Sequence, residues 1–176
     1  MENPIVSVLM GSDSDLSIMR EAVELLNEFG VPHEVLILSA HRSPEETTKF
    51  AKNALERGIK IIIAAAGGAA HLAGVIASLF PLPVIGVPIK TSTLNGIDSL
   101  YSIVQMPPGI PVATVGINGA KNAGILAVEI LAVQNKDLQN KLRDYKKKLN
   151  DDVLAKTKKL QKIGYKKYLE NLKLNH

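Results

Sequence analysis

The chain has 176 residues, of which 46% are hydrophobic and none is cysteine. This length allows one well-buried core, and the missing thiols exclude disulfides, thiolate zinc sites, iron–sulfur clusters and a cysteine nucleophile. Because there is no secretory signal segment and no apolar run near the roughly 20 residues of a membrane helix, we expect a single cytoplasmic domain with no membrane contact.

The net charge of +4 is distributed unevenly along the chain. Residues 1–135 contain 8 basic and 12 acidic residues, a balance of −4, whereas residues 136–176 contain 13 basic and 5 acidic residues, a balance of +8. The lysines of this last segment alternate with Leu, Ile and Tyr at helical spacing, which favours a solvated helical face over a nucleic-acid contact. We therefore expect no nucleic-acid partner.

The first 135 residues alternate short, β-branched apolar runs with amphipathic segments, a pattern typical of strand–helix–strand units on a parallel sheet. The run Ile61-Ile62-Ile63 is apolar on both faces, which predicts helices above and below the sheet. We expect an α/β fold, a three-layer α/β/α sandwich with a parallel, flavodoxin-like sheet. Strands are predicted over 5–10, 34–38, 60–65, 84–87 and 112–115, and helices over 15–29, 44–57, 69–79 and 121–133.

Several predicted helix ends rest on particular residues. Ser43 is expected to cap the second helix, with Pro44 at its first position and Glu46 completing a capping box. Gly30 and Gly58 are expected to end the first and second helices.

Beyond Val133 the apolar periodicity is only helical, over 136–156 and 159–172. No further strand is left for these helices to cover. We therefore expect one domain over 1–176 in which 136–176 is a helical extension that packs on the domain or on a neighbouring subunit.

Ligands of an open parallel sheet bind at the carboxyl ends of its strands. The loop after the first predicted strand, residues 11–15, matches neither the Gly-x-Gly-x-x-Gly nor the Gly-x-x-x-x-Gly-Lys pattern, which argues against nicotinamide and ATP chemistry. Ser12 and Asp15 are suited to binding a ribose or phosphate at a helix N-terminus. An equally favoured alternative is that Ser12, Asp13 and Ser14 only cap that helix.

The loop after the second strand, residues 39–43, contains adjacent His41 and Arg42. Imidazole titrates near neutrality, so His41 is suited to proton transfer, although a lone histidine is more often a polar residue without chemistry. Arg42 is suited to a bidentate contact with a phosphate or carboxylate. An equally favoured alternative is that it only forms an ion pair on the surface.

The loop after the third strand has two glycines and two alanines before His71, which leaves its backbone amides accessible to a small carboxylate. We favour His71 as a pocket residue over a purely structural one. His33 and His176 have no polar cluster around them, and no function is expected of them.

These loops, with one further segment, resemble the class I PurE-type N5-carboxyaminoimidazole ribonucleotide mutases. Any one motif is weak, but four in the family's order and spacing are highly specific, and they extend over residues 5–133. The matching segments are Gly11-Ser12-Asp13-Ser14-Asp15, Ser39-Ala40-His41-Arg42, Ala66-Gly67-Gly68-Ala69-Ala70-His71-Leu72 and Leu94-Asn95-Gly96-Ile97-Asp98-Ser99-Leu100-Tyr101-Ser102-Ile103-Val104-Gln105-Met106-Pro107.

The resemblance implies an isomerase of purine biosynthesis that interconverts N5-carboxyaminoimidazole ribonucleotide and 4-carboxy-5-aminoimidazole ribonucleotide. It implies decarboxylation and recarboxylation, with carbon dioxide retained and His41 moving a proton. Ser12 and Asp15 would contact the ribonucleotide, and Ser39 and Arg42 would hold its phosphate end. The wall around the migrating carboxylate would be Gly67, Gly68, Ala69, Ala70, His71 and Leu72.

The same resemblance implies no cofactor, no metal and a homo-octamer. The first alternative is a carboxylase that uses carbon dioxide and aminoimidazole ribonucleotide directly; the related class with that activity lacks the Gly-Gly-Ala-Ala-His loop. A flavodoxin-like electron carrier is disfavoured because the chain has no Trp, 3 Phe and 4 Tyr, too few aromatic residues to stack a flavin. In a non-enzymatic nucleotide-binding module, His41 would be incidental.

Overall fold

The computed structural model describes residues 3–173 and contains a five-stranded, all-parallel sheet with the order β2-β1-β3-β4-β5. This is the flavodoxin-like order, in which the strand sequence reverses between β1 and β3. Val8 at the centre of the sheet lies between Val35 and Ile63. The strands are β1 (Val6–Met10), β2 (His33–Ile37), β3 (Ile61–Gly67), β4 (Val84–Ile89) and β5 (Ala113–Thr114).

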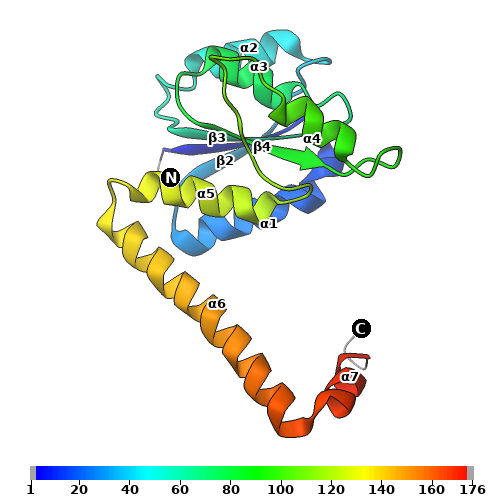
Figure 1. Cartoon of the computed structure of the whole chain (residues 1–176). Coiled ribbons are helices and arrows are strands. Elements are labelled where there is room, and N and C mark those ends of the chain that lie inside the picture. Colours follow the sequence, from blue (N-terminus) through cyan, green and yellow to red (C-terminus); the bar gives the residue numbers. More distant parts are fainter. Residues whose placement is uncertain (1–2, 174–176) are drawn as a thin grey trace. The chain divides into compact units, whose positions relative to one another are not determined.

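Helices cover both faces of the sheet, as Figure 1 shows. One face carries α2, α3 and α4, and the other carries α1 and α5. The predicted three-layer α/β/α sandwich is therefore confirmed. The helices of these layers are α1 (Leu16–Phe29), preceded by the short 3-10 turn η1 (Asp13–Asp15), α2 (Pro44–Asn53), α3 (Leu72–Leu79), α4 (Ile97–Val104) and α5 (Ala120–Ala132).

The core on the α2, α3 and α4 side is built from alternate residues of the buried strands. Ile62 and Ala64 of β3 point to this face, because side chains of a strand alternate with a period of two. They pack with Phe50, Ile76 and Ile103, one from each of the three helices. This core fixes α3 and α4 against the sheet directly below the ends of β3 and β4.

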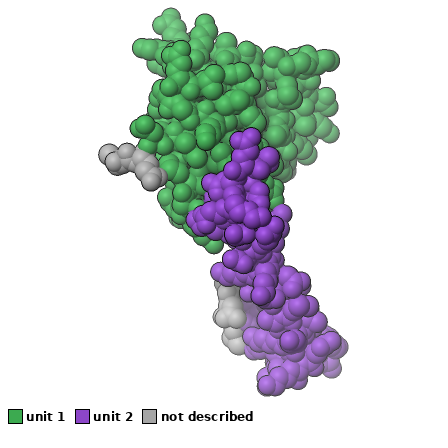
Figure 2. Space-filling view, turned by 90° about the vertical axis from the view of Figure 1, so that its left-hand side faces the viewer, with its two compact units in different colours: residues 1–131 green, residues 132–176 purple. Residues whose placement is uncertain are grey.

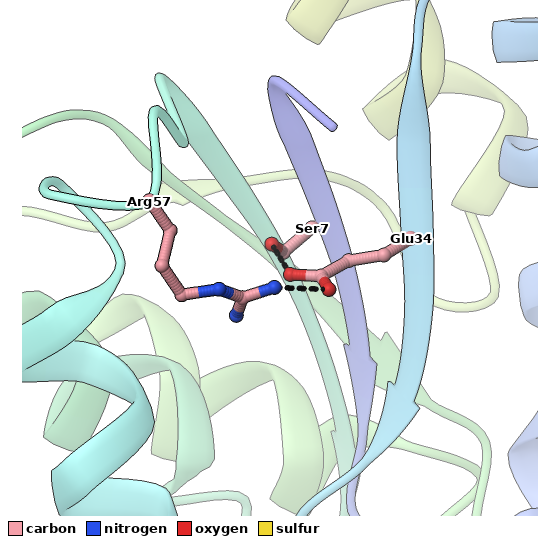
Figure 3. A network of polar contacts seen from close by, with 3 residues as sticks. All are labelled: Ser7, Glu34 and Arg57. Atoms are coloured by element: carbon pink, nitrogen blue, oxygen red, sulfur yellow. Dashed lines mark hydrogen bonds and ion pairs between the residues drawn. The ribbon is translucent and has the colours of Figure 1, made fainter. Parts of the chain in front are cut away.

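A polar network ties the edge strand β2 to its neighbours (Figure 3). The buried Ser7 hydroxyl of β1 donates to Glu34 Oε1 of β2 over 2.7 Å, and Arg57 Nη2 donates to the other carboxylate oxygen over 2.6 Å. The Arg57 guanidinium also lies 5.6 Å from the centre of the Phe50 ring. The carboxylate of Glu34 therefore joins β1, β2 and the turn after α2.

Several predicted element ends are wrong. Ser43 makes no side-chain cap on α2, because its hydroxyl accepts from the Ser39 N–H and donates to the Ser39 carbonyl. That helix ends at Asn53, and a turn closing at Gly58 (φ +87°) follows it, whereas Gly30 ends α1 in the left-handed conformation as expected. The third helix begins at Leu72 and not at residue 69, so that the 67–71 loop consists of Gly67, the last residue of β3, and the irregular residues 68–71.

Helix α4 is absent from the predicted elements. Its sequence gives weak helix signals: Gly96 (φ +92°) stands at its start without a side-chain cap, and the helix is only 8 residues long. The motif 94–107 is thus a loop followed by a short helix, and this helix packs on β4.

The chain divides into two compact units, residues 1–131 and 132–176, which Figure 2 colours separately. In the second unit, α6 (Lys136–Ile163) is one helix of 28 residues and α7 (Tyr165–Lys173) follows it. The predicted break near residue 157 is wrong, because Thr157 bonds back to the Val153 carbonyl within the helix and the chain turns at Gly164 (φ +77°). The packing partner of this extension stays a prediction.

Among residues 3–173, none of the helices is both long and apolar enough to cross a membrane.

Gly86 of β4 is required by the close packing of α4 on the sheet. A Cβ at this position would collide with Ile103 and would lie 2.9 Å from Val112 Cγ1. Gly86→Ala is therefore expected to lower the free energy of unfolding by about 1–3 kcal/mol, as overpacked cores do. Denaturant unfolding followed by circular dichroism measures it.

Gly116→Ala is the matched control, since a Cβ there meets no atom within 4 Å. Equal stability of the two variants would contradict the packing assigned to α4.

Candidate active site

The carboxyl ends of four parallel strands surround one cavity of about 410 Å³. Three of its walls are the loops singled out in the sequence, and the fourth is the segment 89–91 after β4. The lining residues are Gly11, Ser12, Ser14, Asp15, Ser39, Ala40, His41, Arg42, Ala66, Gly67, Ala69, His71, Leu72, Ile89, Lys90 and Thr91. The structure thus brings most of the predicted site residues together.

Two predicted wall residues do not line this cavity. Ala70 is fully buried in the core beside α2 and α3. Gly68 adopts φ +68° and directs its peptide groups to α4. His33 lies outside the cavity at the start of β2, with its Nδ1 2.8 Å from the Val31 carbonyl, and His176 lies outside the described residues.

Arg42 joins the first two loops of the cavity. Its Nη2 donates to the Gly11 carbonyl, and its Nε and backbone N–H both donate to Ser39 Oγ, at 3.5 and 3.1 Å. Ser39 is itself held by α2, since its carbonyl accepts from Thr47 Oγ1 over 3.2 Å. The guanidinium is therefore fixed at the cavity wall and makes no salt bridge within the part of the chain described here.

The His41 and His71 side chains contact each other at the cavity wall. His41 Nε2 lies 2.9 Å from His71 Nδ1, and the two rings meet edge to face with centroids 4.9 Å apart. One of these two nitrogens carries the shared hydrogen and the other accepts it, so this contact leaves His41 Nδ1 available for a substrate. Both residues are exposed to the cavity opening.

Ser12 and Asp15 hold the first loop in shape as well as lining the cavity. Ser12 Oγ accepts from the Ser14 N–H over 3.4 Å and so caps the 3-10 turn η1, while α1 itself has no side-chain cap. Asp15 is buried, and its carboxylate accepts from Ser14 Oγ over 3.2 Å. Burial raises the pKa of the Asp15 carboxyl above its ordinary value of 3.8, although the Ser14 hydrogen bond and the nearby Arg42 charge oppose the rise.

Ile89, Lys90 and Thr91 were missed by the sequence analysis. The signal for them was present: 89–91 follows a buried strand, and the rule that selected the other three loops applies to it equally. Thr91 Oγ1 donates to the carboxylate of Asp98 at the start of α4, at 2.8 Å to Oδ1. The Lys90 N–H donates to Asn118 Oδ1 over 2.8 Å, which fixes the backbone of this segment.

Comparison with known proteins identifies the family. The model of the family described as AIR carboxylase matches residues 5–152. This chain belongs to the AIR carboxylase family. The family match includes the whole cavity, and the prediction of a PurE-type chain is confirmed.

Relatives of this family member are similar to it over nearly their full length. The N5-carboxyaminoimidazole ribonucleotide mutase of Thermotoga maritima is 59% identical over 94% of this chain and 97% of its own. The mutase of Pyrococcus horikoshii is 58% identical over 96% and 95%. The phosphoribosylaminoimidazole carboxylase of Candida glabrata is 56% identical over 97% of this chain, which spans only 30% of that longer protein.

The same fold occurs in a solved structure of the family. PurE of Treponema denticola superposes with a TM-score of 0.81 at 30% identity, over 89% of this chain and 98% of that one.

Replacing Asp15 tests the electrostatics of the cavity. The pKa of Asp15 is raised in the folded protein, so folding favours the protonated acid. The free energy of unfolding is therefore highest below about pH 3.8 as far as this group is concerned, and it falls as the pH rises through the raised pKa. Asp15→Asn has no carboxyl group at this position and therefore does not lose stability in this way. We expect it to melt at a higher temperature than the parent at neutral pH, with the difference shrinking toward pH 4, in thermal melts between about pH 4 and pH 8.

Asp13→Asn is the control, because Asp13 is an exposed carboxylate of the same loop. A melting temperature of Asp15→Asn at or below that of the parent at neutral pH would contradict the claim that burying the ionised Asp15 carboxylate destabilises the fold.

Proposed function

We propose that this chain is an N5-carboxyaminoimidazole ribonucleotide mutase of purine biosynthesis. The observation that carries the proposal is the single cavity in which the proton-transfer candidate His41 faces a loop of small residues at 67–71. The mutases of Thermotoga maritima and Pyrococcus horikoshii, which are 59% and 58% identical to it, support the same activity.

The reaction moves a carboxylate and one proton within one molecule. First the bond from N5 to the carboxylate carbon breaks, its electrons stay on nitrogen, and that nitrogen takes a proton as carbon dioxide is released. The ring carbon C4 then attacks carbon dioxide, and loss of the C4 proton restores the aromatic ring. Atoms and charge balance without ATP, an oxidant or a metal, so the reaction needs no cofactor.

The residues of the cavity are suited to these two steps. His41 would give a proton to N5 and take one from C4, which one imidazole can do when both atoms come within reach of the same ring nitrogen. His71 bonds to the other nitrogen and so sets which one faces the substrate. Gly67, Ala69 and Leu72 would enclose carbon dioxide in a small, water-poor space, which limits its escape.

The polar end of the cavity would hold the ribonucleotide. The Arg42 guanidinium and Ser39 on the second loop would bind the phosphate, and Ser12 and Asp15 the ribose. Lys90 adds a second cation to the lining. The homo-octamer expected from the resemblance and the cytoplasmic location expected from the sequence belong to this proposal.

A direct carboxylase is the second candidate, and the carboxylase of Candida glabrata favours it. The two differ in the substrate that they accept. We expect purified protein to convert the carbamate N5-carboxyaminoimidazole ribonucleotide at low bicarbonate, and to use aminoimidazole ribonucleotide with bicarbonate far less efficiently. Absorbance of the 4-carboxy product measures both rates. Faster conversion of aminoimidazole ribonucleotide with bicarbonate would instead identify the protein as a carboxylase.

His41→Asn is expected to lower kcat by about 10²–10⁴-fold and to leave product binding nearly unchanged, because it removes proton transfer and keeps a polar side chain. Calorimetric titration with the product measures the binding. His33→Asn, at the start of the strand that precedes the His41 loop and outside the cavity, should keep the parent's kcat. An unchanged kcat in His41→Asn would reject the role of His41.

A further inference from the structure

Helix α4 reaches the 67–71 loop through two serines that do not line the cavity. Ser99 is fully buried; its hydroxyl accepts from the Gly68 N–H over 2.9 Å and donates to the Ile89 carbonyl over 2.6 Å. Ser102, one turn later, donates to the Gly68 carbonyl over 3.1 Å and shares that hydrogen with the Asp98 carbonyl at 2.8 Å. Both backbone groups of Gly68 are therefore held by one helix.

This double contact fixes two peptide planes. In a planar trans peptide, the N–H of one residue points opposite to the carbonyl of the residue before it. Ser102 and the Ala70 N–H hold the Gly68 carbonyl on one side, so the Ala69 N–H is directed to the other. No residue in the range 3–173 accepts a hydrogen bond from the Ala69 N–H, and Ala69 lines the cavity.

The backbone conformation of Gly68 does not by itself fix the orientation of this peptide. Gly68 stands at φ +68°, a conformation that glycine enters and leaves readily. A Cβ at Gly68 would meet no atom within 4 Å, so there is free space on that side of its Cα. The two hydroxyls of α4, together with the Ala70 N–H, supply the restraint.

The same helix also fixes the neighbouring wall. The Asp98 carboxylate accepts from Thr91 Oγ1, and Ser99 bonds to the carbonyl of Ile89. The ends of β3 and β4 are thereby coupled to one rigid element.

We propose that Ser99 and Ser102 are positioning residues, which hold the Gly68 peptides so that the Ala69 N–H stays directed at carbon dioxide between its release and its recapture. This inference rests on the proposed mutase reaction. The backbone N–H donates to an oxygen of carbon dioxide, and this bond keeps the molecule near C4 of the ring. If the peptide turns, the donor is lost and carbon dioxide escapes before the new bond forms.

Retention of a carbon label separates this role from a general loss of stability. The carbamate substrate carrying ¹³C in its carboxylate is converted in unlabelled bicarbonate buffer, and the label in the product is measured by mass spectrometry. The parent should keep most of the label. Ser99→Ala and Ser102→Ala should release aminoimidazole ribonucleotide, lose label to exchange, and lower kcat by about tenfold to a hundredfold with a smaller change in KM.

Two further variants complete the test. Ser102→Thr keeps the hydroxyl and should restore label retention. Ser78→Ala removes an exposed serine whose hydroxyl donates to the Val75 carbonyl of its own helix α3, and should behave as the parent. If Ser99→Ala does not fold, Ser102 carries the test, because it is only half-buried. Full label retention in Ser102→Ala would overturn the proposal, even if its kcat fell.

A crystal structure of Ser102→Ala tests the positioning without the reaction. A turned Gly68–Ala69 peptide supports the proposal, and an unmoved peptide overturns it. Failure of the parent to convert the carbamate at all would instead reject the proposed function.

Discussion

The parallel direction of β1 to β4 is the constraint on which the site depends. Four parallel strands end at one edge of the sheet, so that their loops, far apart in sequence, meet around one cavity. Loops of Gly, Ala and Ser have little packing of their own. Arg42 donates a hydrogen bond to the first loop, and Ser99 accepts one from the Gly68 N–H of the third; these bonds give the loops one shape. A rigid sheet brings the loops together, and a few side chains then hold them in place.

Stability and chemistry conflict at this edge of the sheet. A buried Asp15 and a row of small residues in place of bulky ones both weaken folding, and the apolar strands and helices below them offset that cost. Arg42 and His41 each use some of their nitrogen atoms to contact a neighbouring loop and keep others available to the cavity. His41 is the clearest case, since His71 occupies one ring nitrogen and leaves the other for a substrate.

Most of the fold and site could be predicted from the sequence, because buried parallel strands and the loops after them have strong local signals. The strand order followed from the predicted flavodoxin-like fold, and the family motifs placed His41 and His71 in one pocket, but the hydrogen bond between the two rings was not predicted. Helix α4 could not, since Gly96 and a length of 8 residues give little local signal and its place is decided by packing on β4. Ala70 was misjudged for a related reason: the sequence of a small-residue loop does not show which of its residues turns into the core.

The central claim is that these loops and His41 surround one reacting ring. A crystal structure with bound 4-carboxy-5-aminoimidazole ribonucleotide tests it most directly. The account predicts the carboxylate against Ala69, the phosphate at Arg42, and C4 of the ring within hydrogen-bonding reach of His41 Nδ1. A ribonucleotide bound elsewhere, or a His41 ring turned away from C4, would contradict it.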